Sequence, residues 1–226
     1  MATPIRLLDP ASIHHVVSRG NNGGWIVRDA IDRAAYRMRF DIVASAYNWE
    51  VFAWCLMTTH DHTVLRAPEG CISAGMQALH SRHAVGVNRR HGRLGHLYEN
   101  RFFAVELADD SHFVAATAYV NRNPVAAFAV EKAEDWRDSS YRATIGLDRA
   151  PAWLAVEFVL GVFGRTSERG RAELAERVRS GRVPASEALE EARRFEERGC
   201  ACLPQSRSLG VDEREHLVAL ALHQLP

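Results

Sequence analysis

The sequence predicts an α+β protein with a ferredoxin-like core, in which helices cover one face of an antiparallel sheet, and with a helical C-terminal extension. Runs rich in β-branched and aromatic residues alternate with runs at helical spacing in the order β-α-β-β-α-β-α, and the first six elements have the ferredoxin-like order. After Pro124 the pattern changes, and residues 166–198 are dense in Glu, Arg and Ala. We expect a helix or helical pair there, with its charges on an exposed face rather than in a site. This divides the chain into a core domain over residues 1–147 and an extension over residues 148–226.

The composition limits the classes of function. With 28 basic and 28 acidic residues the formal net charge is zero, which argues against a protein that coats nucleic acid by bulk charge but leaves a local basic groove open. We find no signal peptide and no apolar run that could span a membrane, so a reduced, cytoplasmic compartment is expected. The sequence has four cysteines, of which the last two form a C-A-C pair that is only a weak zinc signal: Cys55, Cys71, Cys200 and Cys202.

The first elements are a strand and a capped helix. Residues 12–18, S-I-H-H-V-V-S, predict the strand, and R-G-N-N-G-G after it predicts a turn. His14 and His15 are adjacent and face opposite ways, so they are poor candidates for a shared metal. Asp29 is expected to cap a helix over residues 30–47. The apolar residues that we expect on its core face are Ile31, Ala35, Met38, Ile42 and Tyr47.

The central element is the run V-F-A-W-C-L-M-T-T-H-D-H-T-V-L-R over residues 51–66. It predicts a buried strand that ends in His60 and His62, with a second strand over residues 63–66 beside it. Side chains two positions apart share a face of a strand, so the two imidazoles point the same way and could share a metal ion. Asp61 is expected to point to the other face or to start a turn.

The core continues with a helix and a strand. Residues 71–91 predict the helix and residues 97–107 the strand. The positions that we expect inside the helix pattern are Met76, Leu79, His83 and Val87.

The last core helix carries the second half of a candidate site. Asp109 or Ser111 can cap it, and it is expected to end at about Arg122, because the residue before a proline disfavours helical conformation. Tyr119 and Asn123 are four positions apart and therefore share a helix face.

A phenol, an amide oxygen and two imidazoles would converge if this helix lies against the strand that holds His60 and His62. That set suits metal-assisted attack of a tyrosine hydroxyl on a phosphodiester. An ordinary phenol has a pKa of about 10, so the hydroxyl needs activation by a metal or a base. The residues alone leave a plain alternative open: a chance H-x-H among 11 histidines, a core Tyr119, and an Asn123 that simply ends the helix.

Four stretches together resemble the HUH single-strand transposases, in the branch of REP-associated tyrosine transposases. They are H-H-V-V-S-R-G-N-N, M-T-T-H-D-H, G-H-L-Y-E-N-R-F-F-A-V, and Y-V-N-R-N-P-V-A-A with E-D-W-R-D-S-S-Y-R-A, which occur in the family's order over roughly residues 12–145. The resemblance implies a ferredoxin-like nuclease core. It implies that His60 and His62 bind a divalent ion, Mg²⁺ or Mn²⁺, that Asn123 is the third polar ligand, and that Tyr119 is the nucleophile.

The activity implied by the resemblance is that of a metal-dependent single-stranded DNA endonuclease and strand transferase. It would act through a covalent 5′-phosphotyrosine intermediate on REP-like or other hairpin DNA. Two departures keep other functions open: Asp61 stands where the family usually has an apolar residue, and Thr58 and Thr59 replace the more usual Pro-Asn step. The alternatives are a degenerate protein that binds hairpin DNA without cutting it, and a metal nuclease in which water attacks.

The expected partner is single-stranded or hairpin DNA, with a homodimer as a possibility and no membrane. Aromatic residues Tyr98, Phe102 and Phe103 interleave with the most basic stretch, and we expect some to stack on bases and about half to be core. The residues proposed from the sequence to contact DNA lie in this stretch and in the Gly/Asn turn: Arg19, Asn21, Arg82, Arg89, Arg90, Arg93 and Arg101.

Overall fold

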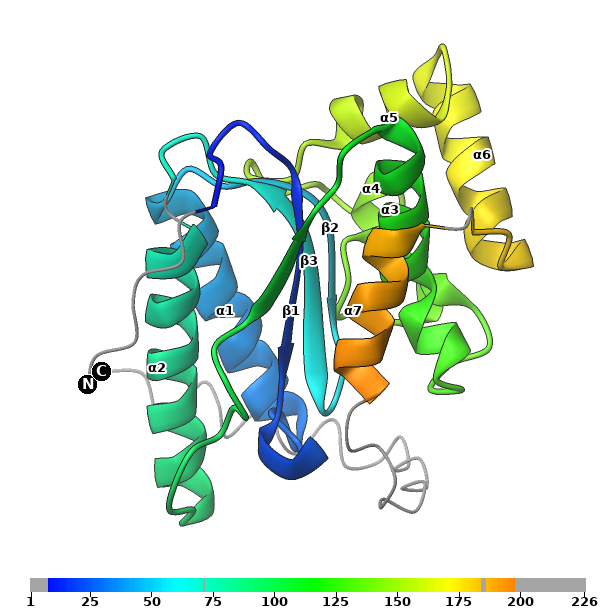
Figure 1. Ribbon diagram of the computed structural model, residues 1–226. Coiled ribbons are helices and arrows are strands. Elements are labelled where there is room, and N and C mark those ends of the chain that lie inside the picture. The colour runs from blue at the N-terminus through cyan, green and yellow to red at the C-terminus, as the bar shows by residue number, and fades with distance from the viewer. Residues whose placement is uncertain (1–7, 71, 184–185, 198–226) are drawn as a thin grey trace.

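A computed structural model describes residues 8–70, 72–183 and 186–197. Within these ranges the strands form one antiparallel four-stranded sheet in the order β2-β3-β1-β4, which confirms the ferredoxin-like core (Figure 1). The strands are β1 (His14–Arg19), β2 (Glu50–Leu56), β3 (His60–Arg66) and β4 (Phe103–Glu106). Cys71, Cys200 and Cys202 lie outside the described residues, and the domain boundary at residue 147 stays a prediction.

The two histidines open a strand instead of closing one. We expected His60 and His62 at the end of the long apolar strand, but that strand stops at Leu56 and the histidines begin β3. A tight turn separates the two strands, closed by a 2.8 Å bond from the Met57 amide to the carbonyl of His60. β3 then pairs with β2 on one side and with β1 on the other, so the histidines lie on a central strand.

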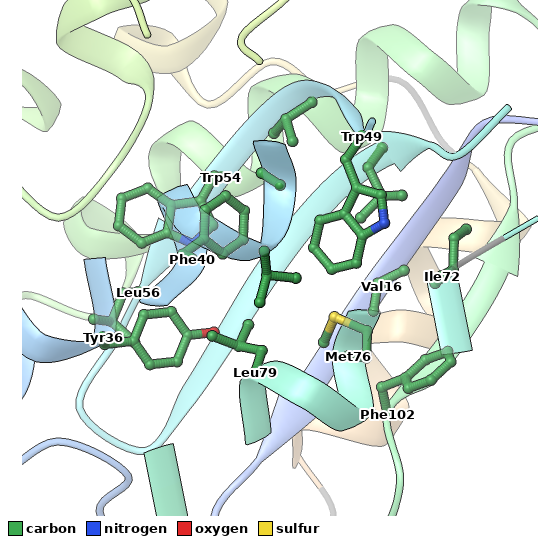
Figure 2. Packing of buried hydrophobic residues seen from close by; sticks show 14 of the residues in the cluster. Val16, Tyr36, Phe40, Trp49, Trp54, Leu56, Ile72, Met76, Leu79 and Phe102 are labelled. Carbon is green, nitrogen blue, oxygen red and sulfur yellow. The ribbon is translucent and has the colours of Figure 1, made fainter. Parts of the chain in front are cut away.

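Two helices, α1 (Ala30–Ala46) and α2 (Ile72–His91), cover one face of the sheet (Figure 1). As predicted, the Asp29 carboxylate caps α1, accepting hydrogen bonds from the amides of Ile31 and Asp32. Four residues of the predicted helix pattern are buried on α2: Met76, Leu79, His83 and Val87. Figure 2 shows how aromatic side chains of α1 and β2 pack with apolar side chains of α2 in this layer.

The face that α1 turns to the core differs from the predicted one. Met38 and Ile42 are 55% and 49% exposed, whereas Tyr36 and Phe40 are buried. The rings of Tyr36 and Phe40 lie 6.4 and 5.1 Å from the ring of Trp54 (Figure 2). Aromatic rings bury more apolar area than Met or Ile, so the helix is oriented by its aromatic residues.

Helix α3 (Asp110–Ala126) lies on the other face of the sheet and includes Pro124 in its last turn. The prediction that the helix ends before Asn123 is therefore wrong. Proline removes one hydrogen bond, to the carbonyl four residues earlier. The helix nevertheless continues, because the amide of Ala127 bonds the carbonyl of Asn123 at 2.9 Å. The predicted cap Asp109 is confirmed, since its carboxylate accepts a bond from the His112 amide.

The predicted strand over residues 97–107 is shorter, because β4 covers only Phe103–Glu106. Before it the chain makes an isolated bridge between Gly20 and Tyr98 and then turns away. Tyr98 and Phe102 are buried, and Phe103 stacks on Phe195 with ring centroids 5.2 Å apart. These rings are therefore part of the packing of the described residues.

The remaining elements are mostly short. They are η1 (Asn21–Gly23), η2 (Ala133–Asp135), α4 (Tyr141–Thr144), α5 (Val156–Phe163), α6 (Ser167–Ser180) and α7 (Glu187–Glu197). Helices α6 and α7 are the helical pair predicted for the extension. In Figure 1, α7 lies across the same face of the sheet as α3, where it contacts β1 and β4. Among the described helices none is both long and apolar enough to cross a membrane.

Candidate active site

The two histidines of β3 project from the face of the sheet that α3 and α7 cover. They are two positions apart, so both side chains lie on one face, with ring centroids 5.0 Å apart. His62 is fully buried and His60 is 9% exposed. Asn123 on α3 reaches both rings, with its amide oxygen 3.4 Å from Nε2 of His60 and its amide nitrogen 3.2 Å from Nε2 of His62. The structure therefore brings together the three side chains that the sequence suggested as metal ligands.

Tyr119 lies one helical turn before Asn123 and completes the predicted set. Its ring centroid is 5.6 Å from that of His62, with the two rings perpendicular. The side chain is 9% exposed, so the phenol lies at the edge of the buried site. The i, i+4 spacing on α3 thus places the phenol and the amide over the same two imidazoles.

A fifth side chain, Glu196 of α7, lies at the centre of this group, and the sequence prediction missed it. Its Oε1 is 3.0 Å from Nε2 of His60, and its Oε2 is 3.4 Å from Nε2 of His62. Oε2 also accepts a hydrogen bond from the hydroxyl of Tyr119. The expectation that the charges of residues 166–198 form an exposed face is therefore wrong for this residue. No spacing or composition in the sequence distinguishes it from Glu190 or Glu191.

The charges in the site are coupled through Glu196. Burial alone would raise the pKa of this carboxyl, but the charge of His62 and the hydrogen bond with His60 hold it well below its usual range. Burial, followed by the negative charge of Glu196, raises the pKa of Tyr119 above its ordinary value. The tyrosine is thus a neutral hydrogen-bond donor to a carboxylate at physiological pH.

The donor set fits a small divalent cation. One ligand atom each from His60, His62 and Glu196 lie within 4.8 Å of one another. The carboxylate and the amide oxygen of Asn123 are hard donors of the kind that Mg²⁺ and Mn²⁺ prefer, and imidazole nitrogen is a ligand that Mn²⁺ also accepts.

His15 on β1 contacts the ring nitrogen of His62 that does not face Asn123 and Glu196. Its Nε2 is 3.1 Å from Nδ1 of His62, and its side chain is fully buried. Burial, with the neighbouring His62, lowers the pKa of His15 to about 3, so the ring stays neutral. His14 contacts the Ser12 carbonyl and does not join this group. Adjacent residues do face opposite ways, as predicted, but one of the two histidines supports the site through a second histidine.

Both departures from the family pattern leave the pairing of strand β3 intact. Asp61 is fully buried on the opposite face of β3, near the hydroxyls of Tyr36 and Ser18, and burial raises its pKa to about 7. Thr59 contacts Nδ1 of His60 through its hydroxyl at 3.0 Å. Neither residue disturbs the strand, and Thr59 helps to orient His60.

Three of the arginines proposed to contact DNA lie on α2, away from the face of the sheet that α3 and Tyr119 cover. Arg82 and Arg89 are exposed on α2, which covers the opposite face of the sheet (Figure 1). Arg90 forms ion pairs with Asp29 at 2.6 Å and Asp32 at 2.7 Å, which tie α2 to the start of α1.

The other proposed contacts are distributed over loops. Arg93 lies over the ring of Trp25 at 4.5 Å, and Asn21 is in η1. Arg101 is exposed just before β4. Arg19 is 5% exposed and donates to the backbone carbonyls of Phe195 and Glu196, so it adjoins the site but lies inside the protein.

A cavity of about 240 Å³ opens beside Tyr119. The guanidinium of Arg193 lies over the phenol, 5.3 Å from the ring centroid. The cavity is lined by Tyr119, Arg122, Ala126, Gly181, Val183, Leu189, Glu190 and Arg193. Two arginines thus supply positive charge next to the phenol, although neither belongs to the basic stretch identified from the sequence.

Comparison with known proteins agrees with this arrangement. Residues 11–123, half of the 226-residue chain, match the family model of IS200-like transposases. Among solved structures, a REP-associated tyrosine transposase bound to a REP hairpin matches with a TM-score of 0.54 and 15% sequence identity, over 64% of this chain and 86% of that chain. At this identity the match concerns the fold, and a search of the curated proteins found no match. The chain belongs to the family of IS200-like transposases.

Proposed function

We propose that this protein is a metal-dependent single-stranded DNA endonuclease and strand transferase that acts through a covalent bond between Tyr119 and DNA. The observation that carries the proposal is the convergence of Tyr119 with His60 and His62, from a helix and a strand that are far apart in the sequence. Membership of the IS200-like transposase family supports transposition and strand cleavage as the general activity.

His60, His62 and Asn123 would hold the divalent cation, for which we propose Mg²⁺ or Mn²⁺. When bound, the cation would polarise a phosphate oxygen and neutralise the charge that develops during attack. His15 and Thr59 would keep the two imidazoles in the orientation that points Nε2 into the site.

In the cleavage step, Oη of Tyr119 attacks the scissile phosphorus. A phosphorus–oxygen bond to tyrosine forms while the bond to the 3′ oxygen breaks, leaving a 5′-phosphotyrosine and a 3′ hydroxyl. The phenol gives up its proton as the bond forms, and the departing 3′ oxygen takes up a proton, so that no proton is gained or lost overall. Before attack the Tyr119 hydroxyl is oriented by its hydrogen bond to Glu196. Attack by another 3′ hydroxyl on the phosphotyrosine reverses these events and joins the strands.

The proposed substrate is single-stranded DNA that can form a hairpin. The transposase with the similar fold is bound to a REP hairpin, which motivates this choice. In this chain the cavity with Arg122 and Arg193 offers a route for a phosphate to the edge of Tyr119. Guanidinium groups suit phosphate because they offer paired N–H donors.

Cleavage of an end-labelled hairpin oligonucleotide in Mg²⁺ tests the proposal, with the intact protein compared with Tyr119→Phe and His60→Ala. The matched control is Tyr47→Phe, since Tyr47 follows α1 on the opposite face of the sheet. We expect a protein–DNA adduct with the intact chain and Tyr47→Phe, and a loss on the order of a thousandfold in Tyr119→Phe. Cleavage without an adduct would indicate attack by water, and binding without cleavage would indicate a hairpin-binding protein; either result contradicts the proposal.

A further inference from the structure

The carboxylate of Glu196 contacts both histidines in the way that ligands of a common ion contact one another. Its two oxygens lie 3.0 and 3.4 Å from Nε2 of His60 and of His62. Ligands that each lie about 2.1 Å from one Mg²⁺ ion and at right angles are about 3 Å apart. The spacing therefore suits a shared cation as well as direct hydrogen bonds.

The position of Glu196 is maintained by contacts that do not involve its carboxylate. Arg19 donates to the backbone carbonyls of Phe195 and Glu196, both at 3.3 Å, and so binds the last turn of α7. Phe195 stacks on Phe103 of β4. The apolar side chains of α7 that are buried against the rest of the protein are Ala188, Leu189 and Ala192. Helix α7 is thus a packed part of the protein, and it delivers the carboxylate to a defined place.

The chemistry of the predicted ligands calls for such a group. His60, His62 and Asn123 are neutral as ligands, and imidazole suits softer ions than Mg²⁺. A carboxylate adds a hard oxygen and a negative charge, the two properties that sites for Mg²⁺ and Mn²⁺ use. Glu196 is the carboxylate that the described structure places within reach of both imidazoles.

We propose that Glu196, supplied by helix α7, is the carboxylate ligand of the divalent cation held by His60 and His62. The inference rests on the proposed function, because it assigns an additional ligand to the same metal site. It makes the helical extension part of the active site, so that the transposase core over residues 11–123 has an incomplete ligand set without it.

A blocking role for the same contact predicts the opposite effect on cation affinity. If α7 only blocked an empty site, its carboxylate would compete with the ion for the histidines. Removing the negative charge would then leave cation affinity unchanged or increase it, whereas loss of a ligand weakens it.

Calorimetric titration of Mn²⁺ into the metal-free full chain, without DNA, distinguishes a metal ligand from a blocking group. We expect Glu196→Gln to weaken Mn²⁺ binding at least tenfold. The matched control is Glu191→Gln, which removes the same charge from an exposed position of the same helix and should stay within about twofold of the intact chain. Binding by Glu196→Gln that equals or exceeds that of the intact chain overturns the inference.

Two further measurements keep the result interpretable. Thermal melting in chelator checks that Glu196→Gln is folded. If the variant is unfolded, the calorimetry is replaced by electron–nuclear double resonance of Mn²⁺ bound to the intact chain, labelled with ¹³C at its Glu carboxyls. A ¹³C coupling is expected, and its absence overturns the inference. His60→Ala tests the metal site itself: if it binds Mn²⁺ as the intact chain does, the metal site of the proposed function fails, whereas normal binding by Glu196→Gln alone removes only Glu196.

Discussion

Several side chains of the candidate site are oriented by a partner residue, which comes from another element for His62 and Tyr119 and from the adjacent position for His60. His62 is held by His15, His60 by Thr59, and the hydroxyl of Tyr119 by Glu196. Ligands that are fixed in this way lose little freedom when a cation or a phosphate binds, so that partners outside the ligand set contribute to its affinity.

His15 gives the first prediction at this scale. His15→Leu removes the hydrogen bond to Nδ1 of His62 and should lower Mn²⁺ affinity by about 10- to 100-fold, the usual cost of losing a partner of a metal-binding histidine. His15→Gln, which keeps a hydrogen-bonding group, should recover part of the loss. His14→Gln is the control, because His14 bonds the Ser12 carbonyl and should leave Mn²⁺ affinity unchanged. Equal affinities for His15→Leu and His14→Gln would show that His15 does not position the ligand.

His83 gives a prediction on pH and stability. It is buried in α2, contacts the Ile26 carbonyl at 2.8 Å, and lies 3.3 Å from Arg39. Burial lowers the pKa of His83 to about 4 from 6.5. Between the two pKa values the unfolded chain therefore binds a proton at His83 that the folded chain does not bind. The free energy of unfolding accordingly falls as the pH falls below 6.5.

The expected size follows from 1.36 kcal/mol for each pH unit. Between pH 6.5 and 5, His83 should account for roughly 2 kcal/mol of lost stability. His83→Gln keeps a polar side chain without the titration, so its unfolding free energy should depend less on pH by about this amount. Urea denaturation at pH 7 and pH 5 measures the difference, and identical pH dependence in both proteins would contradict it.

Local periodicity explains which site residues were predictable. His60 with His62 and Tyr119 with Asn123 are pairs within one element, so the strand and helix repeats suffice to place each pair on one face. Glu196 and His15 act across elements, and their roles depend on how α7 and β1 dock. That information is in the packing of the whole chain and not in any local spacing.

At the scale of elements, we expect the same substitution to have opposite effects on stability at two glycines. A Cβ at Gly75 of α2 would lie 2.3 Å from the indole of Trp49, whereas a Cβ at Gly161 of α5 would meet nothing within 4 Å. Gly75→Ala should thus destabilise the protein by about 1–3 kcal/mol through overpacking, and Gly161→Ala should stabilise it by up to about 1 kcal/mol through helix propensity. Chemical denaturation at one pH measures the free energy of unfolding of both variants. A Gly75→Ala variant as stable as the intact chain would show that α2 and Trp49 do not pack as described.

The order of the core elements was predicted correctly, but some boundaries and one face were not. The alternation of β-rich and helical runs is visible in a single sequence, so the ferredoxin-like order could be predicted from it. The face of α1 depends on which rings stack with Trp54, and the end of α3 depends on the hydrogen bonds after Pro124. Both are decided by contacts with neighbours, which periodicity does not contain.

At the scale of the whole molecule, positive charge lies on two sides of the sheet. Arg193 borders the cavity at Tyr119, whereas Arg89 is exposed on α2 across the sheet (Figure 1). A single strand bound at Tyr119 can meet both only by passing round an edge of the sheet.

Salt dependence tests where the strand runs. Each phosphate neutralised on a single strand contributes a slope of about −0.7 to log affinity against log salt. Arg193→Ala should thus reduce the magnitude of the slope by roughly 0.7, and a similar change in Arg89→Ala would show that DNA continues to α2, as predicted from the sequence. Fluorescence anisotropy with a labelled hairpin gives the slopes. An unchanged slope in Arg193→Ala would contradict DNA entry through the cavity.

The central claim is that Tyr119 becomes covalently joined to DNA, and the most direct measurement identifies the tyrosine that carries a nucleotide. The full chain is incubated with a hairpin oligonucleotide and Mn²⁺, the DNA is trimmed with nuclease, and tryptic peptides are sequenced by mass spectrometry. Of the five tyrosines in the chain, we predict a 5′-linked nucleotide on Tyr119. A nucleotide on another tyrosine, or cleaved DNA with no modified peptide, would contradict the claim.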